Sequence, residues 1–190
     1  METIIFDMHG VIMKDPLGNL MPFINQTFPH KTFLEGQNDI YPIAKEAILG
    51  KITLHEFFEK IGFQGDLAKV EKSYLDNLEL DEDFIPCATL LKKKYHLALL
   101  SNDVSEWSLY TRMKYGLDSF FDVITVSGDV GMKKPFPQIY EYTLKQLKQP
   151  ASECFFVDDR QGNLKPAAEL GIKTIHFSNF NDLLKMLYYR

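Results

Sequence analysis

Chemically reactive side chains stand directly after short apolar runs in this sequence. The first run, at residues 3–6, leads into Asp7, and Gly10 follows three residues later. Ligands of open parallel sheets gather outside the carboxyl ends of the strands, so a carboxylate on this loop would face the binding crevice. Gly10 would let the backbone turn sharply and approach a ligand closely. Alone, such an Asp is more often a turn former or a helix cap; in this context it could be a nucleophile, a metal ligand or both.

Two further stretches offer groups that suit an anionic oxygen. Ser101 and Asn102 end the apolar run 96–100, and Lys134 lies in a loop stiffened by prolines on its carboxyl side. Hydrogen-bond donors and a compact positive charge together suit a phosphoryl group. Taken singly, Ser101-Asn102 would be an ordinary strand-ending turn and Lys134 a solvated surface cation.

An acidic pair, Asp158-Asp159, follows the apolar residues 155–157. If that run lies beside the first strand, three carboxylates converge with Asp7 among them. They would repel one another unless a cation lay between them, and hard oxygen ligands with retained water suit Mg²⁺. The competing interpretation is that the pair caps the helix that follows.

From residue 81 onward, apolar runs alternate with helical patterns, which predicts βαβ units and a parallel sheet. The expected strands are residues 3–6, 96–101, 121–126, 154–157 and 173–177. The expected helices between and after them pass through residues 90–91, 105–115, 138–148, 164–170 and 181–189. Right-handed crossovers would cover both faces, giving an α/β, Rossmann-like three-layer core. A GxGxxG fingerprint is absent, which argues against a dinucleotide ligand.

The stretch from about residue 14 to residue 84 has no strong strand pattern and several helix signatures, which predicts a helical insert. Thr53 and Glu56 form a capping box, Asp66 caps another helix, and residues 43–49 form a third amphipathic segment. The proline- and glycine-broken residues before it give no clear assignment. We therefore expect a catalytic core of residues 1–13 and 85–190, with a helical cap of residues 14–84 over the crevice.

Composition narrows the class of protein. The chain has 190 residues, 45% of them hydrophobic and 25% charged, which fits a globular protein with one good core. A net charge of −5 without a dense basic run argues against nucleic acid or an anionic membrane as partner. No apolar run is long enough to span a membrane and the first residues enter a strand at once, so we expect a cytoplasmic protein. For the oligomeric state, our default expectation is a monomer. Cys87 and Cys154 are expected to be buried free thiols.

Four motifs in order resemble the haloacid dehalogenase (HAD) superfamily. They are Asp7-x-x-Gly10-Val11, Ser101-Asn102, Lys134-Pro135-x-Pro137-x-Ile139-Tyr140 and Val157-Asp158-Asp159-x-x-x-Asn163. The stretch through residues 165–171 is especially similar to the branch with the phosphatase domain of soluble epoxide hydrolase and bacterial sugar-phosphate phosphatases. The resemblance covers nearly the whole chain, and the insert matches a small helical cap.

The resemblance implies Mg²⁺-dependent hydrolysis of a small phosphorylated metabolite through an aspartyl-phosphate on Asp7. Mg²⁺ would be held by Asp7, the backbone carbonyl of His9, Asp158 and Asp159. The phosphoryl group would be bound by Gly10, Ser101, Asn102 and Lys134, with Ser101 and Lys134 neutralising its oxygens. Which metabolite is bound, and which cap residues contact it, the sequence does not disclose.

His9 departs from the family pattern, because that position in the family's phosphatases is normally a second aspartate. An imidazole could still serve as a general acid and base, but it is longer and repels Mg²⁺ when protonated. The other interpretation leaves His9 only its backbone carbonyl role in a weakened or inactive enzyme. Two alternatives to a phosphatase stay open. One is a catalytically degenerate family member that binds a phosphorylated ligand or a protein. The other is a metal-independent dehalogenase, and the acidic pair Asp158-Asp159 argues against it.

Overall fold

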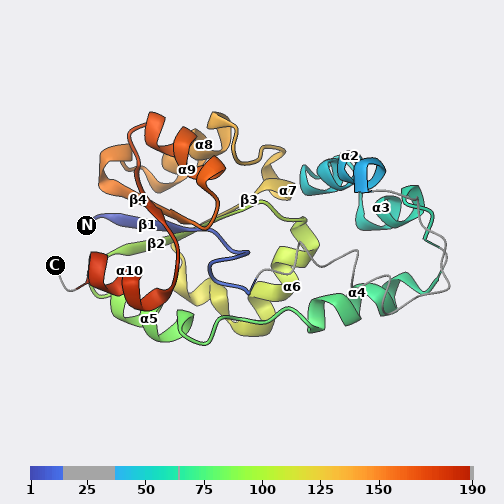
Figure 1. The fold of residues 1–190 in the computed structure, drawn as a ribbon, viewed down its shortest axis with the longest axis horizontal. Coiled ribbons are helices and arrows are strands. Elements are labelled where there is room, and N and C mark those ends of the chain that lie inside the picture. The colour runs from blue at the N-terminus through green and yellow to red at the C-terminus, as the bar shows by residue number, and fades with distance from the viewer. Residues whose placement is uncertain (15–36, 64, 189–190) are drawn as a thin grey trace.

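The computed structural model describes residues 1–14, 37–63 and 65–188. At its centre is a five-stranded parallel sheet in the order β3-β2-β1-β4-β5, seen in Figure 1. The strands are β1 (Thr3–Phe6), β2 (His96–Ser101), β3 (Val123–Val126), β4 (Cys154–Asp158) and β5 (Lys173–His176). The helices around the sheet are α5 (Phe84–Leu91), α6 (Ser105–Tyr115), α7 (Ser127–Val130), α8 (Pro137–Leu147), α9 (Gln161–Glu169) and α10 (Phe180–Leu187).

The first strand is the central one. β1 pairs with β2 on one side and with β4 on the other, so that Thr3 is aligned with both His96 and Cys154. All four residues of β1 are buried. This order brings the carboxyl ends of β2 and β4 to either side of the loop that begins at Asp7, as expected for side chains that must converge.

Alternation of side chains along the strands divides the core between the two faces of the sheet. Ile4 and Phe6 belong to one apolar cluster, on the face covered by α5, α6 and α10. Ile5 belongs to a second cluster, on the face covered by α8 and α9. The sheet is therefore covered on both faces, and the expected three-layer α/β fold is confirmed. Both cysteines are buried free thiols, and burial raises the pKa of Cys87 to about 12.

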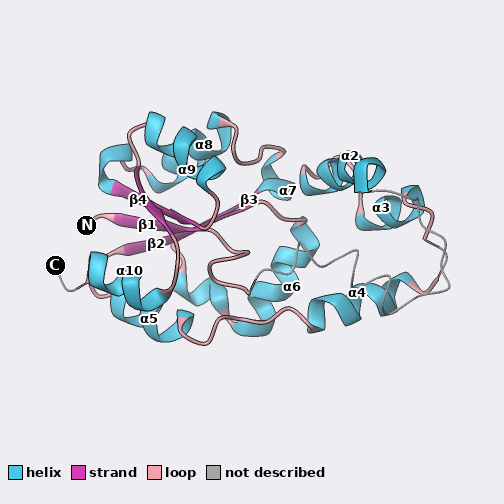
Figure 2. Cartoon of the chain, in the orientation of Figure 1, coloured by secondary structure: helices cyan, strands magenta, loops and turns pink. Residues whose placement is uncertain are grey.

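Three helices, α2 (Gln37–Ile48), α3 (Leu54–Lys60) and α4 (Leu67–Asp76), lie beyond the carboxyl end of the sheet. Figure 2 shows them apart from the strands, and we call them the helical insert. The predicted capping box is present at α3, where Thr53 and Glu56 bond each other's backbone N–H groups. Asp66 caps α4 through the backbone N–H of Lys69. The domain boundaries at residues 14 and 84 stay a prediction.

The elements differ from expectation mainly at their ends. β3 begins at Val123 rather than at residue 121, because Phe121 and Asp122 leave a short 3₁₀ turn, η2 (Leu117–Phe120), before pairing begins. Another 3₁₀ turn, η3 (Ala151–Glu153), precedes β4, and α7 was not anticipated. The broken stretch of residues 16–36 lies outside the described residues.

Candidate active site

A buried lysine joins two of the expected carboxylates. The Nζ atom of Lys134 lies 2.7 Å from Oδ1 of Asp7 and 2.9 Å from Oδ2 of Asp158. Lys134 is only 2% exposed, so the alternative interpretation of this residue as a solvated surface cation is wrong. Burying an ammonium group is costly unless it is paired, and two carboxylates supply that pairing. The three side chains come from the loops after β1, β3 and the end of β4.

Asp158 is fixed by further donors. The side-chain amide of Asn163 donates to both of its carboxylate oxygens at 3.0 Å, and the backbone N–H of Arg160 donates to Oδ1 at 2.8 Å. The carbonyl of Asn163 in turn accepts from the hydroxyl of Tyr140 at 2.8 Å. Helix α9 starts after Arg160, which makes no side-chain cap. Asp158 therefore orders the start of α9 and also faces the site.

Asp159 completes an acidic cluster. One carboxylate oxygen from each of Asp7, Asp158 and Asp159 lies within 4.8 Å of the other two. Gly10 has φ +87, and a Cβ there would lie 2.6 Å from the carboxylate of Asp159. Only glycine therefore fits between the first loop and this carboxylate. The expected convergence of three carboxylates is present.

The pKa of Asp7 is strongly affected by its burial and by the charges around it. Burial, reinforced by the negative charge of Asp158, raises the pKa of Asp7 from 3.8 to about 7, although Lys134 acts in the opposite direction. Lys134 and Arg160, whose Nε lies 4.0 Å from Oδ2 of Asp159, supply positive charge to the cluster, but at Asp7 the effect of burial outweighs that of Lys134. A divalent cation among these oxygens would favour the ionised form of Asp7, and carboxylate oxygens are ligands that suit Mg²⁺.

Ser101 and Asn102 lie at the same edge but are engaged differently. Ser101 is fully buried, and its hydroxyl has no hydrogen-bond partner among the residues that the structure describes. The amide of Asn102 donates from Nδ2 to the carbonyl of Lys134 at 2.9 Å, and its Oδ1 accepts from the N–H of Lys134 at 2.8 Å. Asn102 thereby fixes the loop that carries Lys134, whereas Ser101 keeps a hydroxyl available for a ligand.

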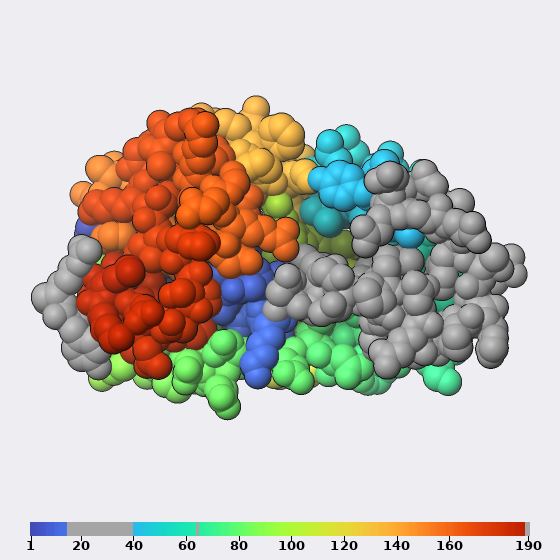
Figure 3. All heavy atoms as spheres, in the orientation of Figure 1, coloured from blue at the N-terminus to red at the C-terminus, as the bar shows by residue number. Residues whose placement is uncertain are grey.

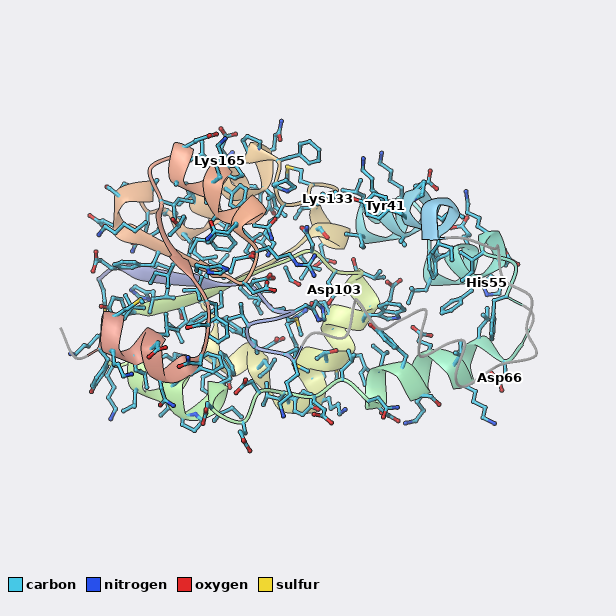
Figure 4. All side chains as sticks on the ribbon, in the orientation of Figure 1. Tyr41, His55, Asp66, Asp103, Lys133 and Lys165 are labelled. Carbon is cyan, nitrogen blue, oxygen red and sulfur yellow. The ribbon has the colours of Figure 1, made fainter. Side chains whose placement is uncertain are left out.

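Asp103 belongs to the candidate site although it was not among the residues predicted from the sequence. Its Oδ2 atom lies 2.9 Å from Nε2 of His9, and both side chains are buried. Its Oδ1 accepts from the backbone N–H of Val104 at 2.8 Å, which fixes the carboxylate. The available signal was position, because Asp103 follows the two strand-ending residues already selected. Figure 4 labels Asp103 at the centre of the molecule, between the sheet and the helical insert.

The N-terminal residues reach the surface of the molecule. Figure 3 shows them, in blue, at the centre of one face, between the C-terminal elements and the green segment. In the helical insert, Phe57 and Phe58 are buried while Tyr41 is 67% exposed.

In the described part of the chain, no helix is long and apolar enough to cross a membrane.

A parallel three-layer α/β fold in this chain carries a carboxylate on the central loop, a buried lysine and an acidic cluster. Residues 1–171 match the family model described as haloacid dehalogenase-like hydrolase, and the chain belongs to this family. The resemblance seen in the four motifs is thereby confirmed.

The chain is similar to curated proteins of several kinds. The chain is 26% identical over 193 residues to D-ribitol-5-phosphate phosphatase of Bacteroides thetaiotaomicron, covering 95% of this chain and 94% of the relative. It is 38% identical over 92 residues to bifunctional epoxide hydrolase 2 of Rattus norvegicus, covering 46% of this chain but only 17% of that protein. The chain thus spans a small part of the length of the epoxide hydrolases that it matches.

Solved structures agree on the fold. A HAD-family enzyme from Bacteroides thetaiotaomicron in its magnesium complex superposes with a TM-score of 0.84 at 21% identity, covering 99% of this chain and 98% of that one. At this identity the likeness concerns the fold alone.

Proposed function

We propose that this hydrolase cleaves a small phosphomonoester in a Mg²⁺-dependent reaction that passes through an aspartyl-phosphate on Asp7. The observation that carries the proposal is the buried cluster in which Lys134 contacts both Asp7 and Asp158, beside the unpartnered hydroxyl of Ser101. A phosphoryl group carries several anionic oxygens, and these groups offer it a nucleophile, a cation and a hydrogen-bond donor. Two findings support the proposal: the family match and the full-length likeness to a sugar-alcohol phosphatase.

The residues present fit a magnesium ion. Asp7, Asp158 and Asp159 bring oxygens within 4.8 Å of one another, and carboxylate oxygens are ligands that suit Mg²⁺. We propose that these three carboxylates and the backbone carbonyl of His9 hold the ion. When bound, Mg²⁺ would supply positive charge that stabilises developing negative charge on the phosphoryl oxygens.

The chain's own groups can perform both halves of the reaction. A carboxylate oxygen of Asp7 forms a bond to phosphorus while the bond from phosphorus to the alcohol oxygen breaks, and the departing alkoxide takes a proton from protonated His9. Neutral His9 then removes a proton from water, whose oxygen attacks the same phosphorus. The bond to Asp7 breaks, phosphate departs and the carboxylate is regenerated. Lys134 and Ser101 compensate the charge on the oxygens throughout.

The contact with Asp103 favours a working role for His9 over a backbone role alone. A buried carboxylate 2.9 Å from the ring stabilises its imidazolium form, which is the form that can donate a proton to a leaving group. In this proposal, His9 and Asp103 together perform the acid–base role that a second aspartate has in the family's phosphatases. Asp103 is a positioning residue in this proposal, since it acts through His9.

The deciding experiment measures phosphate release from a panel of phosphomonoesters with Mg²⁺ and with EDTA, for wild type and Asp7→Asn. We expect Mg²⁺-dependent release that Asp7→Asn abolishes, because the amide keeps the shape and loses the nucleophile. Asp122→Asn is the control, since Asp122 lies in an exposed pair with His96. Wild-type rates in Asp7→Asn would sink the covalent mechanism. Ester binding without turnover would indicate the degenerate binding member instead.

A further inference from the structure

A cavity of about 350 Å³ lies between the helical insert and the core. Two of its lining residues also support the candidate site: Asn102 fixes the backbone of Lys134, and Asp103 contacts His9. The cavity therefore lies next to the candidate site, separated from Lys134 and His9 by the residues that contact them. Its volume is in the range of small-ligand pockets, and it would surround whatever the phosphoryl group is attached to.

The wall formed by the insert is apolar. Tyr41, Ala44 and Ile48 follow the i, i+3, i+7 spacing of one face of α2, and all three line the cavity. Leu54 and Phe57 of α3 extend the same wall. Together these side chains present carbon atoms to the cavity along two successive helices.

The core adds a second apolar wall. Val104 and Trp107 line the cavity from the start of α6. The indole N–H of Trp107 donates to Oε1 of Glu71 at 3.1 Å, on α4. Trp107 therefore has its only hydrogen-bond donor engaged and offers the cavity the faces and edges of its ring.

Two polar residues of the described lining, Asn102 and Asp103, have their side chains engaged in hydrogen bonds. The amide of Asn102 bonds the backbone of Lys134 with both of its heavy atoms, and the two carboxylate oxygens of Asp103 contact His9 and the N–H of Val104. A hydroxyl-rich ligand entering here would exchange its water partners for carbon surface, which costs free energy for each unpaired hydroxyl.

Two further charged residues of the described lining, Lys133 and Arg160, are cations that belong to the core. Lys133 extends toward Tyr41 of the insert (Figure 4), and its Nζ lies 5.9 Å from the ring centroid of Tyr41. Nε of Arg160 lies 4.0 Å from Oδ2 of Asp159, so this cation suits the phosphate end of a ligand, and the apolar insert suits the opposite end.

We propose that the preferred substrate is a phosphomonoester of an apolar alcohol, an alkyl or aryl phosphate, rather than a sugar or polyol phosphate. The inference rests on the proposed function, because the cavity would hold the alcohol whose bond to phosphorus breaks. That alcohol leaves with the proton from His9, while the phosphorus passes to Asp7.

The test compares esters matched in carbon number, pentyl phosphate against ribitol 5-phosphate, and a series from ethyl to hexyl phosphate. We expect kcat/KM to rise by about fourfold for each methylene group that becomes buried. Pentyl phosphate should exceed ribitol 5-phosphate by at least an order of magnitude. Preference for ribitol 5-phosphate, or a flat alkyl series, overturns the inference and leaves the proposed function standing.

Variants of the insert locate the effect. Ala44→Leu fills the cavity from a half-buried position of α2, so it should reduce kcat/KM for hexyl phosphate more than for ethyl phosphate. Tyr41→Ser should weaken use of the longer esters, and Met113→Ser, at another exposed apolar residue on α6, should not. Equal effects of Tyr41→Ser and Met113→Ser, or a length-independent effect of Ala44→Leu, would contradict the assignment.

Calorimetry with the same two five-carbon esters and Asp7→Asn separates the two failures. Tighter binding of pentyl phosphate without turnover by wild type supports the apolar cavity and overturns the hydrolytic function. Tighter or equal binding of ribitol 5-phosphate overturns the apolar cavity whatever the turnover.

Discussion

The ring of His9 is held by the carboxylate of Asp103, at 2.9 Å between Nε2 and Oδ2, with both groups buried. A similar contact on the surface provides a reference: Nδ1 of His96 lies 2.7 Å from Oδ2 of Asp122, with both side chains nearly half exposed. The two pairs have the same chemistry and differ in burial and in distance from the site. Any functional effect peculiar to the first pair can therefore be measured against the second.

Removal of the Asp103 charge should slow the reaction without abolishing substrate binding. Asp103→Asn should lower kcat by about 10- to 100-fold and change KM little, because the ring of His9 loses its orienting partner. His9→Ala should cost at least as much, and the double variant should be no worse than His9→Ala alone. Steady-state kinetics decide this, with Asp122→Asn as the control. Additive losses would mean that the two residues act separately.

Restoring the family's usual aspartate should require two changes. His9→Asp places a second carboxylate beside buried Asp103 and should destabilise the protein by about 1–3 kcal/mol. Adding Asp103→Asn removes the repulsion, so the double variant should recover stability and exceed wild type in kcat. Urea unfolding and turnover of simple esters are the measurements. If His9→Asp alone is as stable as wild type, the two carboxylates do not interact.

Stability without metal should depend on pH through Asp7. Its pKa is raised from 3.8 to about 7, so folding favours the protonated form. The contribution of Asp7 relative to Asp7→Asn is then fully present below pH 4 and is lost as pH rises toward 7. In EDTA, the difference in unfolding free energy, wild type minus Asp7→Asn, should fall across this window. A difference that rises with pH would mean that Lys134 outweighs burial.

Magnesium should reverse that loss. At 100 times its dissociation constant, a ligand specific for the folded state adds about 2.7 kcal/mol of stability, so Mg²⁺ should raise Tm by several degrees at pH 7.5. Asp159→Ala should remove most of the shift, and Asp122→Asn should retain it. A full shift in Asp159→Ala would exclude Asp159 as a ligand.

Contact between the insert and the core can be probed with two glycines of similar backbone conformation. Gly50 has φ +64, and a Cβ there would lie 2.2 Å from the carbonyl oxygen of Gly128; Gly116 has φ +65 and open space around it. Gly116→Ala should cost about 1–2 kcal/mol through backbone strain alone. Gly50→Ala should cost more and should also raise KM, because α2 must move away from α7. Equal costs in thermal unfolding would mean that the contact yields easily.

Much of this architecture could be predicted from local sequence. β1 and β2 have the predicted bounds, because an apolar run flanked by polar residues defines a buried strand with little competition. The capping box at Thr53 was equally local. Helix α7 escaped prediction because four residues with a glycine among them carry no helical period.

Some residues of the candidate site could likewise be predicted from local sequence, and others could not. Asp7 and Lys134 were recognisable because each motif is a short run with a fixed place after a strand. Asp103 could not be recognised as a partner of His9, since 94 residues separate them and only the pairing of β1 with β2 brings them together. The lining of the apolar cavity is still less visible, because it depends on which faces of α2, α3 and α6 meet.

The central position of β1 affects the risk of aggregation while the chain is being translated. Its two neighbours are supplied about a hundred and a hundred and fifty residues later, since Thr3 pairs with His96 and with Cys154. During translation, β1 therefore exposes two apolar faces and two unsatisfied hydrogen-bonding edges until β2 and β4 have also left the ribosome. Such an edge invites pairing with another nascent chain. A product truncated between β2 and β4 should accordingly aggregate.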